Sequence, residues 1–167
     1  MSASHSAVIS AIGRGFDGLD VPALAKDLGA ELIRLEDFDA TVAAVLAEAP
    51  AAENIVAQGT GDIAFDAEVA AALGLPLAII SGAPQRTGEL AQHNAESLGA
   101  TVAGIFTDLE AVPGALAALG DVSPVMSADL FQKQLIDQAR AAGSHIVLPE
   151  GDDDRILEAA HVVLRDK

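Results

Sequence analysis

The sequence predicts an α/β protein built on a doubly wound parallel sheet, and three observations support this prediction. Short β-branched apolar segments alternate with Ala- and Leu-rich segments of helical period. Four helical segments end in a Leu-Gly pair, where glycine can adopt the left-handed conformation that stops a helix. Strict alternation of strands and helices places helices on both faces of a parallel sheet. We expect this first domain to occupy residues 1–120.

The predicted strands are apolar and short, as expected where both faces of a strand are buried. They are Ala7–Ile12, Glu31–Leu35, Asn54–Ala57, Leu77–Ser81, Thr101–Phe106 and His145–Leu148. The predicted helices are Val21–Leu28, Ala40–Glu48, Asp66–Leu73, Thr87–Leu98, Val112–Leu119, Ala128–Ala142 and Asp153–Arg165. Pro22 supports the first of these helices, because a proline near a helix start removes an N–H that would have no partner there.

The rhythm breaks after the fifth helix. Asp121–Pro124 predicts a linker over residues 121–126, and residues 127–167 then follow with a helix, a strand and another helix. One strand and two helices cannot bury a sheet face alone, so we expect the incomplete opening of a second α/β domain. The alternative is that this last unit docks on the first domain as its sixth strand.

Composition excludes several classes of protein. The formal net charge of −16 opposes binding to nucleic acid or to an anionic membrane. The chain has no cysteine, which rules out cysteine nucleophiles, thiolate metal sites and disulfide scaffolds. No targeting signal is visible and the apolar runs are too short to span a bilayer, so we expect a soluble cytoplasmic protein.

The loop after the first predicted strand has two interpretations, both involving phosphate. Gly13, Gly15 and Gly18 fit the dinucleotide fingerprint GxGxxG, and Glu36 lies at the distance expected for the ribose ligand. Asp17, however, would put negative charge where a pyrophosphate must sit. This hypothesis describes a small nucleotide-binding oxidoreductase module.

The same loop also has the spacing of a phosphate-binding P-loop. Leu19 occupies the position of the lysine, and Asp20 that of the Ser/Thr which binds Mg²⁺. Both replacements remove the chemistry that such a loop needs, so this interpretation predicts a degenerate P-loop.

Other polar residues give no convincing site. Asp152, Asp153 and Asp154 suit the start of a helix better than a divalent cation site. Arg86 opens a predicted helix and could meet an anion, although an arginine there is common. The four histidines share no metal-binding spacing: His5, His93, His145 and His161. We therefore expect no catalytic residue, no metal site and no tightly bound cofactor in this chain.

The run from Ser123 through Leu164 resembles the opening of the catalytic domain of the phosphate acetyl/butyryl transferase family. That domain begins with an SP or TP step, a helix ending in Ala-Arg, a strand reading IVLPEG, and an acidic pair followed by arginine and an Ala-rich helix. The matching segments here are Ala139–Arg140, Ile146–Gly151, Asp153–Arg155 and Glu158–Ala160.

The resemblance implies transfer of an acetyl group between CoA and phosphate, with acetyl-CoA or CoA and phosphate as substrates and a homo-oligomer as a possible assembly. It also implies an N-terminal extension similar to the P-loop domain of dethiobiotin synthetases, in which Gly13–Gly18 is the degenerate loop. Two departures are the short extension and the absence of a visible middle domain. The family's acetyl-CoA and phosphate residues lie beyond the opening unit, so the chain alone is expected to be inactive.

Three hypotheses follow. The first is an N-terminal piece of a phosphate acetyltransferase whose reading frame continues or has been cut. The second is a free-standing regulatory or interaction domain that binds a partner subunit. The third is the nucleotide-binding module described above.

Overall fold

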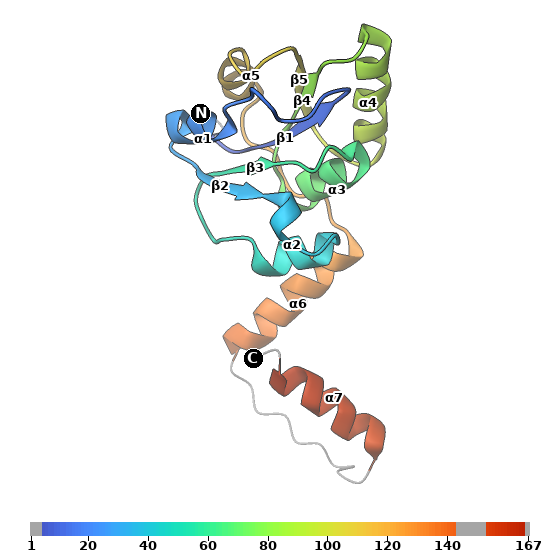
Figure 1. The fold of residues 1–167 in the computed structure, drawn as a ribbon. Coiled ribbons are helices and arrows are strands. Elements are labelled where there is room, and N and C mark those ends of the chain that lie inside the picture. The colour runs from blue at the N-terminus through green and yellow to red at the C-terminus, as the bar shows by residue number, and fades with distance from the viewer. Residues whose placement is uncertain (1–4, 143–152, 166–167) are drawn as a thin grey trace. The chain divides into compact units, whose positions relative to one another are not determined.

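The computed structural model describes residues 5–142 and 153–165, and the chain divides into two compact units, Met1–Leu130 and Phe131–Lys167. The first unit contains a five-stranded sheet of order β2-β3-β1-β4-β5 in which every pairing is parallel (Figure 1). The predicted α/β class and parallel sheet are therefore confirmed.

The elements follow the predicted alternation. The strands are β1 (Ala7–Ile12), β2 (Glu31–Arg34), β3 (Ile55–Gln58), β4 (Leu77–Ser81) and β5 (Val102–Phe106). The helices of the first unit are α1 (Val21–Leu28), α2 (Val42–Glu48), α3 (Ile63–Leu73), α4 (Gln85–Ser97) and α5 (Val112–Leu119), with a 3-10 helix η1 (Leu35–Asp37) after β2. Two further helices are α6 (Ala128–Ala142) and α7 (Asp154–Arg165). The predicted strand His145–Leu148 lies outside the described residues.

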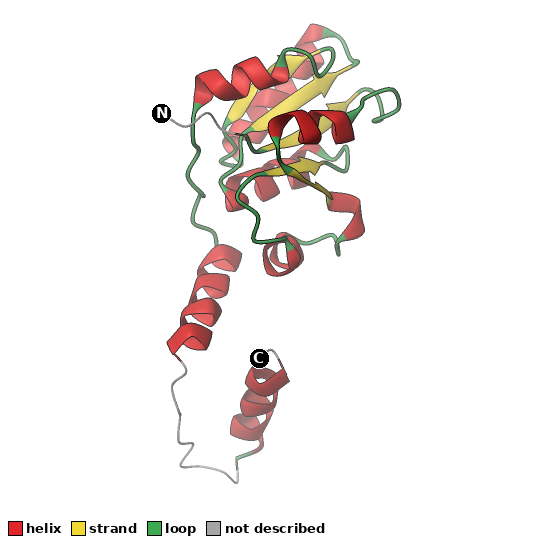
Figure 2. Cartoon of the chain, turned by 90° about the vertical axis from the view of Figure 1, so that its left-hand side faces the viewer, coloured by secondary structure: helices red, strands yellow, loops and turns green. Residues whose placement is uncertain are grey.

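The sheet is covered by helices on both faces, as Figure 2 shows for the strands in yellow. Val8 and Ile12 of β1 belong to a core cluster that includes residues of α2, α3 and α4, whereas Ala7 and Ile9 belong to a second cluster with α1 and α5. The crossover from β1 to β2 runs in the direction opposite to the three later crossovers. Because such crossovers are right-handed, α1 must cover the face opposite to α2, α3 and α4, as observed.

Several element boundaries differ from the predicted ones by a few residues, and for α3 and β2 the difference has a clear local cause. Helix α3 begins at Ile63 because the Asp62 carboxylate accepts hydrogen bonds from the N–H groups of Ala64 and Phe65. Both faces of α3 are largely buried, so its first turn lacked the one-sided apolar pattern that marks a surface helix. Strand β2 ends at Arg34, since Leu35 already starts η1.

The segment expected as a linker, residues 121–126, lies within the first compact unit. The Val125 N–H donates to the carbonyl of Ala71 in α3 at 2.8 Å. Among the described residues, no helix combines the length and apolarity needed to cross a membrane.

Candidate functional site

The carboxyl ends of the parallel strands meet at one edge of the sheet, where open α/β sheets bind their ligands. The connections after β1, β3, β4 and β5 begin at this edge. Strand β1 is central, with β3 on one side and β4 on the other, and it is followed by the predicted phosphate loop. This edge is therefore the place to test the loop's chemistry.

The loop after β1 lies directly against the loop after β4. Gly13 has a φ of +66°, and a Cβ atom built on it would lie 2.6 Å from the Cβ of Ala83. The Gly82 N–H donates to the carbonyl of Ile12 at 2.9 Å and continues the pairing between the two strands. Gly13 therefore permits a close contact between two protein loops, which is a structural requirement independent of any ligand.

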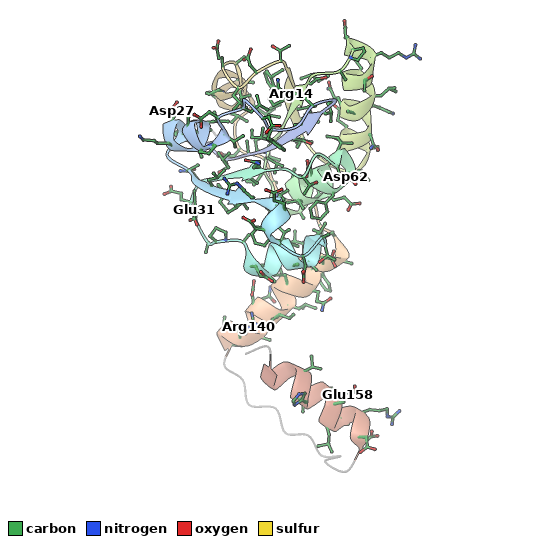
Figure 3. The ribbon with its side chains drawn as sticks, in the orientation of Figure 1. Arg14, Asp27, Glu31, Asp62, Arg140 and Glu158 are labelled. Carbon is green, nitrogen blue, oxygen red and sulfur yellow. The ribbon has the colours of Figure 1, made fainter. Side chains whose placement is uncertain are left out.

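Arg14 is the cationic side chain of this loop and is labelled in Figure 3. Its guanidinium donates to the carbonyl of Asp17 at 3.0 Å and to the carbonyl of Thr107, beyond β5, at 3.4 Å. The side chain is exposed. Arg14 thus links the β1–α1 loop to the β5–α5 loop through main-chain oxygens.

The N-terminus of α1 has its donors already occupied. The Val21 N–H donates to the carbonyl of Leu19 at 3.0 Å, and the Leu24 N–H to the carbonyl of Asp20 at 3.1 Å. The Ala23 N–H donates to the Asp20 carboxylate at 2.9 Å, while Pro22 has no N–H. A phosphate at this helix end would have to displace a carboxylate that already caps the helix.

Glu36 is placed away from the glycine loop by the order of the strands. It lies in η1 at the end of β2, and β3 separates β2 from β1. Two strand spacings amount to about 10 Å. In the dinucleotide fold, by contrast, the strand carrying the ribose-binding carboxylate neighbours the glycine loop's strand. The structure therefore does not bring Glu36 together with Gly13, Gly15 and Gly18.

A buried aspartate at the same edge was not singled out from the sequence. Asp66 has no exposed surface, and its carboxylate accepts four hydrogen bonds. They come from the Ser10 hydroxyl at 2.6 Å, the Thr60 N–H at 2.8 Å, the Thr60 hydroxyl at 3.0 Å and the Gly61 N–H at 3.3 Å. We call Ser10, Thr60, Gly61 and Asp66 the Asp66 network.

The Asp66 network has the properties of a structural element. Burial raises the pKa of Asp66, and the hydrogen bond from Ser10 together with those from Thr60 and Gly61 opposes this rise. The hydroxyl of Ser10 is buried and its partner is a carboxylate, without a histidine to activate it. The network therefore fastens the β3–α3 loop to β1. In the sequence, Asp66 looks like an ordinary residue of a first helical turn, so no spacing signal distinguished it.

In the described part of the acidic run before the last helix, Asp153 caps the start of α7. The Asp153 carboxylate accepts from the Arg155 N–H at 2.9 Å and from its guanidinium at 2.7 Å. The interaction with Arg155 lowers the pKa of Asp153. Asp152 and His145 lie outside the described residues. Within residues 5–142 and 153–165, no cluster of histidine and carboxylate side chains is suited to hold a metal ion.

The comparisons with known proteins find similarity at the C-terminal end of the chain. A family model described as phosphate acetyl/butaryl transferase matches residues 130–167. A phosphate acetyltransferase from Corynebacterium glutamicum is 69% identical over 39 residues, which cover 23% of this chain and 12% of that relative. No solved structure matches the chain. Residues 130–167 therefore carry the sequence signature of the phosphate acetyl/butaryl transferase family.

Proposed function

We propose that this chain is the amino-terminal part of a phosphate acetyltransferase, which converts acetyl-CoA and phosphate into acetyl phosphate and CoA. The observation that carries this proposal is the 69% identity over 39 residues to a curated phosphate acetyltransferase. The family model supports it, since it matches nearly the same residues. Identity of this level over 39 residues is well beyond what composition alone produces.

The reacting groups of this enzyme are proposed to lie outside residues 1–167. The matched segment spans 12% of the length of the relative. The buried hydroxyl of Ser10, in the described part of the chain, pairs with a carboxylate that already serves a structural network. Acetyl transfer needs a base for the thiol or phosphate and donors for the oxyanion, and we assign neither role to a residue of this chain.

The first unit is proposed to be a non-catalytic extension with a degenerate phosphate loop. Three contacts support this proposal. The N–H groups at the start of α1 have protein acceptors, Arg14 is engaged with main-chain oxygens, and Gly13 packs against Ala83. Each of these groups would have to be released before a phosphate could use the loop as a cradle.

One observation favours the alternative that the first unit is a free-standing regulatory or interaction domain. Residues up to Leu130 form a compact unit whose sheet has a hydrophobic cluster on each face. Such a unit has the core that independent folding needs. This alternative predicts that the unit keeps its structure and a binding activity when the transferase segment is removed.

The test of the proposed function is a chimera. Residues 1–167 are joined to the part of the C. glutamicum relative that follows its matched segment, and formation of acetyl-CoA from acetyl phosphate and CoA is measured. We expect the chimera to be active and the 167-residue chain to be inactive. The matched control is the same chimera without residues 130–167, which should be inactive. A folded chimera that forms no acetyl-CoA would contradict the proposal.

A further inference from the structure

The chain between α5 and α6 follows the surface of the first unit. Val125 donates its N–H to the carbonyl of Ala71 at 2.8 Å. This carbonyl also accepts from the Gly74 N–H at 3.3 Å, so the bond from Val125 is a second donor at the end of α3. A Cβ atom built on Gly74, just past α3, would lie 2.6 Å from the nitrogen of Pro124. Pro124 therefore packs against the backbone that ends α3.

The contact continues into the first turn of α6. Leu130 is 8% exposed and packs with Leu46 of α2 and Ala72 of α3 in a hydrophobic cluster of its own. The Leu130 N–H donates to the Ser127 hydroxyl at 3.1 Å, in the geometry of a helix N-cap. Leu130 therefore both packs against α2 and α3 through its side chain and receives the helix cap through its amide. We call residues 124–130 the seam.

The seam ends at the residue where the family match begins. The family model matches residues 130–167, and Leu130 is the last residue of the first compact unit. Phe131, the next residue of the same helix, is 54% exposed. One residue of α6 is therefore buried on the first unit while its neighbour is open to solvent.

We propose that the seam is a docking surface on which the ends of α2 and α3 hold the first turn of α6, Ala128–Leu130, within the first compact unit. Formation of the first turn of α6 and the stability of α2 and α3 are then linked, and linkage of this kind is reciprocal. The contact of Leu130 stabilises the first turn of α6 and the ends of α2 and α3 by the same coupling free energy, so its loss from either side weakens both.

Hydrogen exchange on the 167-residue chain tests the seam from the helix side. Leu130→Ser should raise amide exchange in the first turn of α6 and at the end of α3 by at least about tenfold, because it places a hydroxyl in an apolar contact. Phe131→Ser is the matched control, and it should leave exchange at the end of α3 unchanged. Equal effects of the two substitutions would overturn the proposal.

The reciprocal test changes Leu46 of α2, which packs against Leu130. Leu46→Ala should speed exchange both in the first turn of α6 and at the end of α3, since the seam couples the two. Leu90→Ala, at a position 61% exposed on α4, is its control. The proposal would be overturned if Leu46→Ala raised the exchange rate at the end of α3 and left the rate in the first turn of α6 unchanged. Slow exchange in β1 and β4 shows in each variant that the sheet remains folded.

The two proposals fail in different ways. An inactive chimera combined with coupled exchange at residues 124–130 would contradict the enzymatic assignment and leave the docking surface standing. An active chimera with uncoupled exchange would support the enzymatic assignment and contradict the docking surface.

Discussion

Two stretches of the chain differ in whether their apolar and charged side chains are buried or exposed. Up to Leu130, apolar side chains fill clusters on both faces of the sheet, and Asp66 is buried among four hydrogen-bond donors. In α6 beyond that residue, Phe131 and Leu135 are 54% and 50% exposed. A charged pair of that helix, Lys133 with Asp137, is also exposed.

The difference falls at Leu130, where the first compact unit ends and the family match begins. No solved structure matches the chain, whereas residues 130–167, which include the exposed Phe131 and Leu135, match the transferase family model. Apolar side chains on helices are normally buried by a partner element. The contrast fits a first unit whose stability derives from its own core and a helix α6 whose apolar side chains beyond Leu130 are exposed.

The largest expected difference between the two regions is measured by truncating one buried and one exposed aliphatic side chain. Ile79 is fully buried at the centre of β4, so Ile79→Ala should lower the free energy of unfolding by about 2–5 kcal/mol because a cavity forms. Leu135→Ala should change stability by less than about 0.5 kcal/mol. Urea unfolding followed by circular dichroism measures both. Similar shifts in the two midpoints would show that α6 is as firmly packed as the sheet.

Much of the first unit could be predicted from the sequence because its elements are signalled locally. The bounds of β1, β4, α1 and α5 agree with the prediction, since apolar runs, Pro22 and Leu-Gly pairs mark them directly. The start of α3 and the 3-10 helix depend on a capping side chain and on a short turn. These features leave little trace in hydrophobic periodicity.

The candidate site was less predictable because it depends on strand order. The spacing of Gly13–Gly18 and Glu36 fitted a dinucleotide fold, but β3 lies between the strands that carry them. Nothing in the spacing reveals which strand lies beside β1. The Asp66 network likewise joins residues 56 positions apart, Ser10 and Asp66, which become neighbours only after the sheet has formed.

A smaller and pH-dependent effect is expected at Asp66. Its raised pKa means that the folded state binds the proton more tightly than the unfolded state. This contribution to stability is fully present below the ordinary value of 3.8 and is lost as the pH rises through the folded-state pKa. Asp66→Asn should cost about 1–3 kcal/mol, because donors in the network lose an acceptor.

The sign of the pH dependence sharpens this test. Because asparagine does not titrate, the stability gap between the natural chain and Asp66→Asn should widen as the pH falls from neutral toward 3.8. Ser10→Ala is the control, since it removes a donor and leaves a titratable Asp66. Urea midpoints at several pH values give the curves. If the stability difference between the natural chain and Asp66→Asn narrowed on acidification, folding would instead favour the charged carboxylate of Asp66 and lower its pKa.

The smallest effect is expected in α6, and it makes the contrast with Asp66 quantitative. Lys133 and Asp137 are one helical turn apart, with side chains 38% and 49% exposed. An exposed pair of this spacing contributes about 0.3–0.5 kcal/mol, because water screens the charges and two long side chains lose freedom. Lys133→Ala should therefore leave the unfolding midpoint of the sheet nearly unchanged and lower the helical signal slightly. The loss should shrink further in high salt, as expected for exposed charges. A salt-independent loss similar to that of Asp66→Asn would place Lys133 in a buried contact and remove the distinction between the two regions.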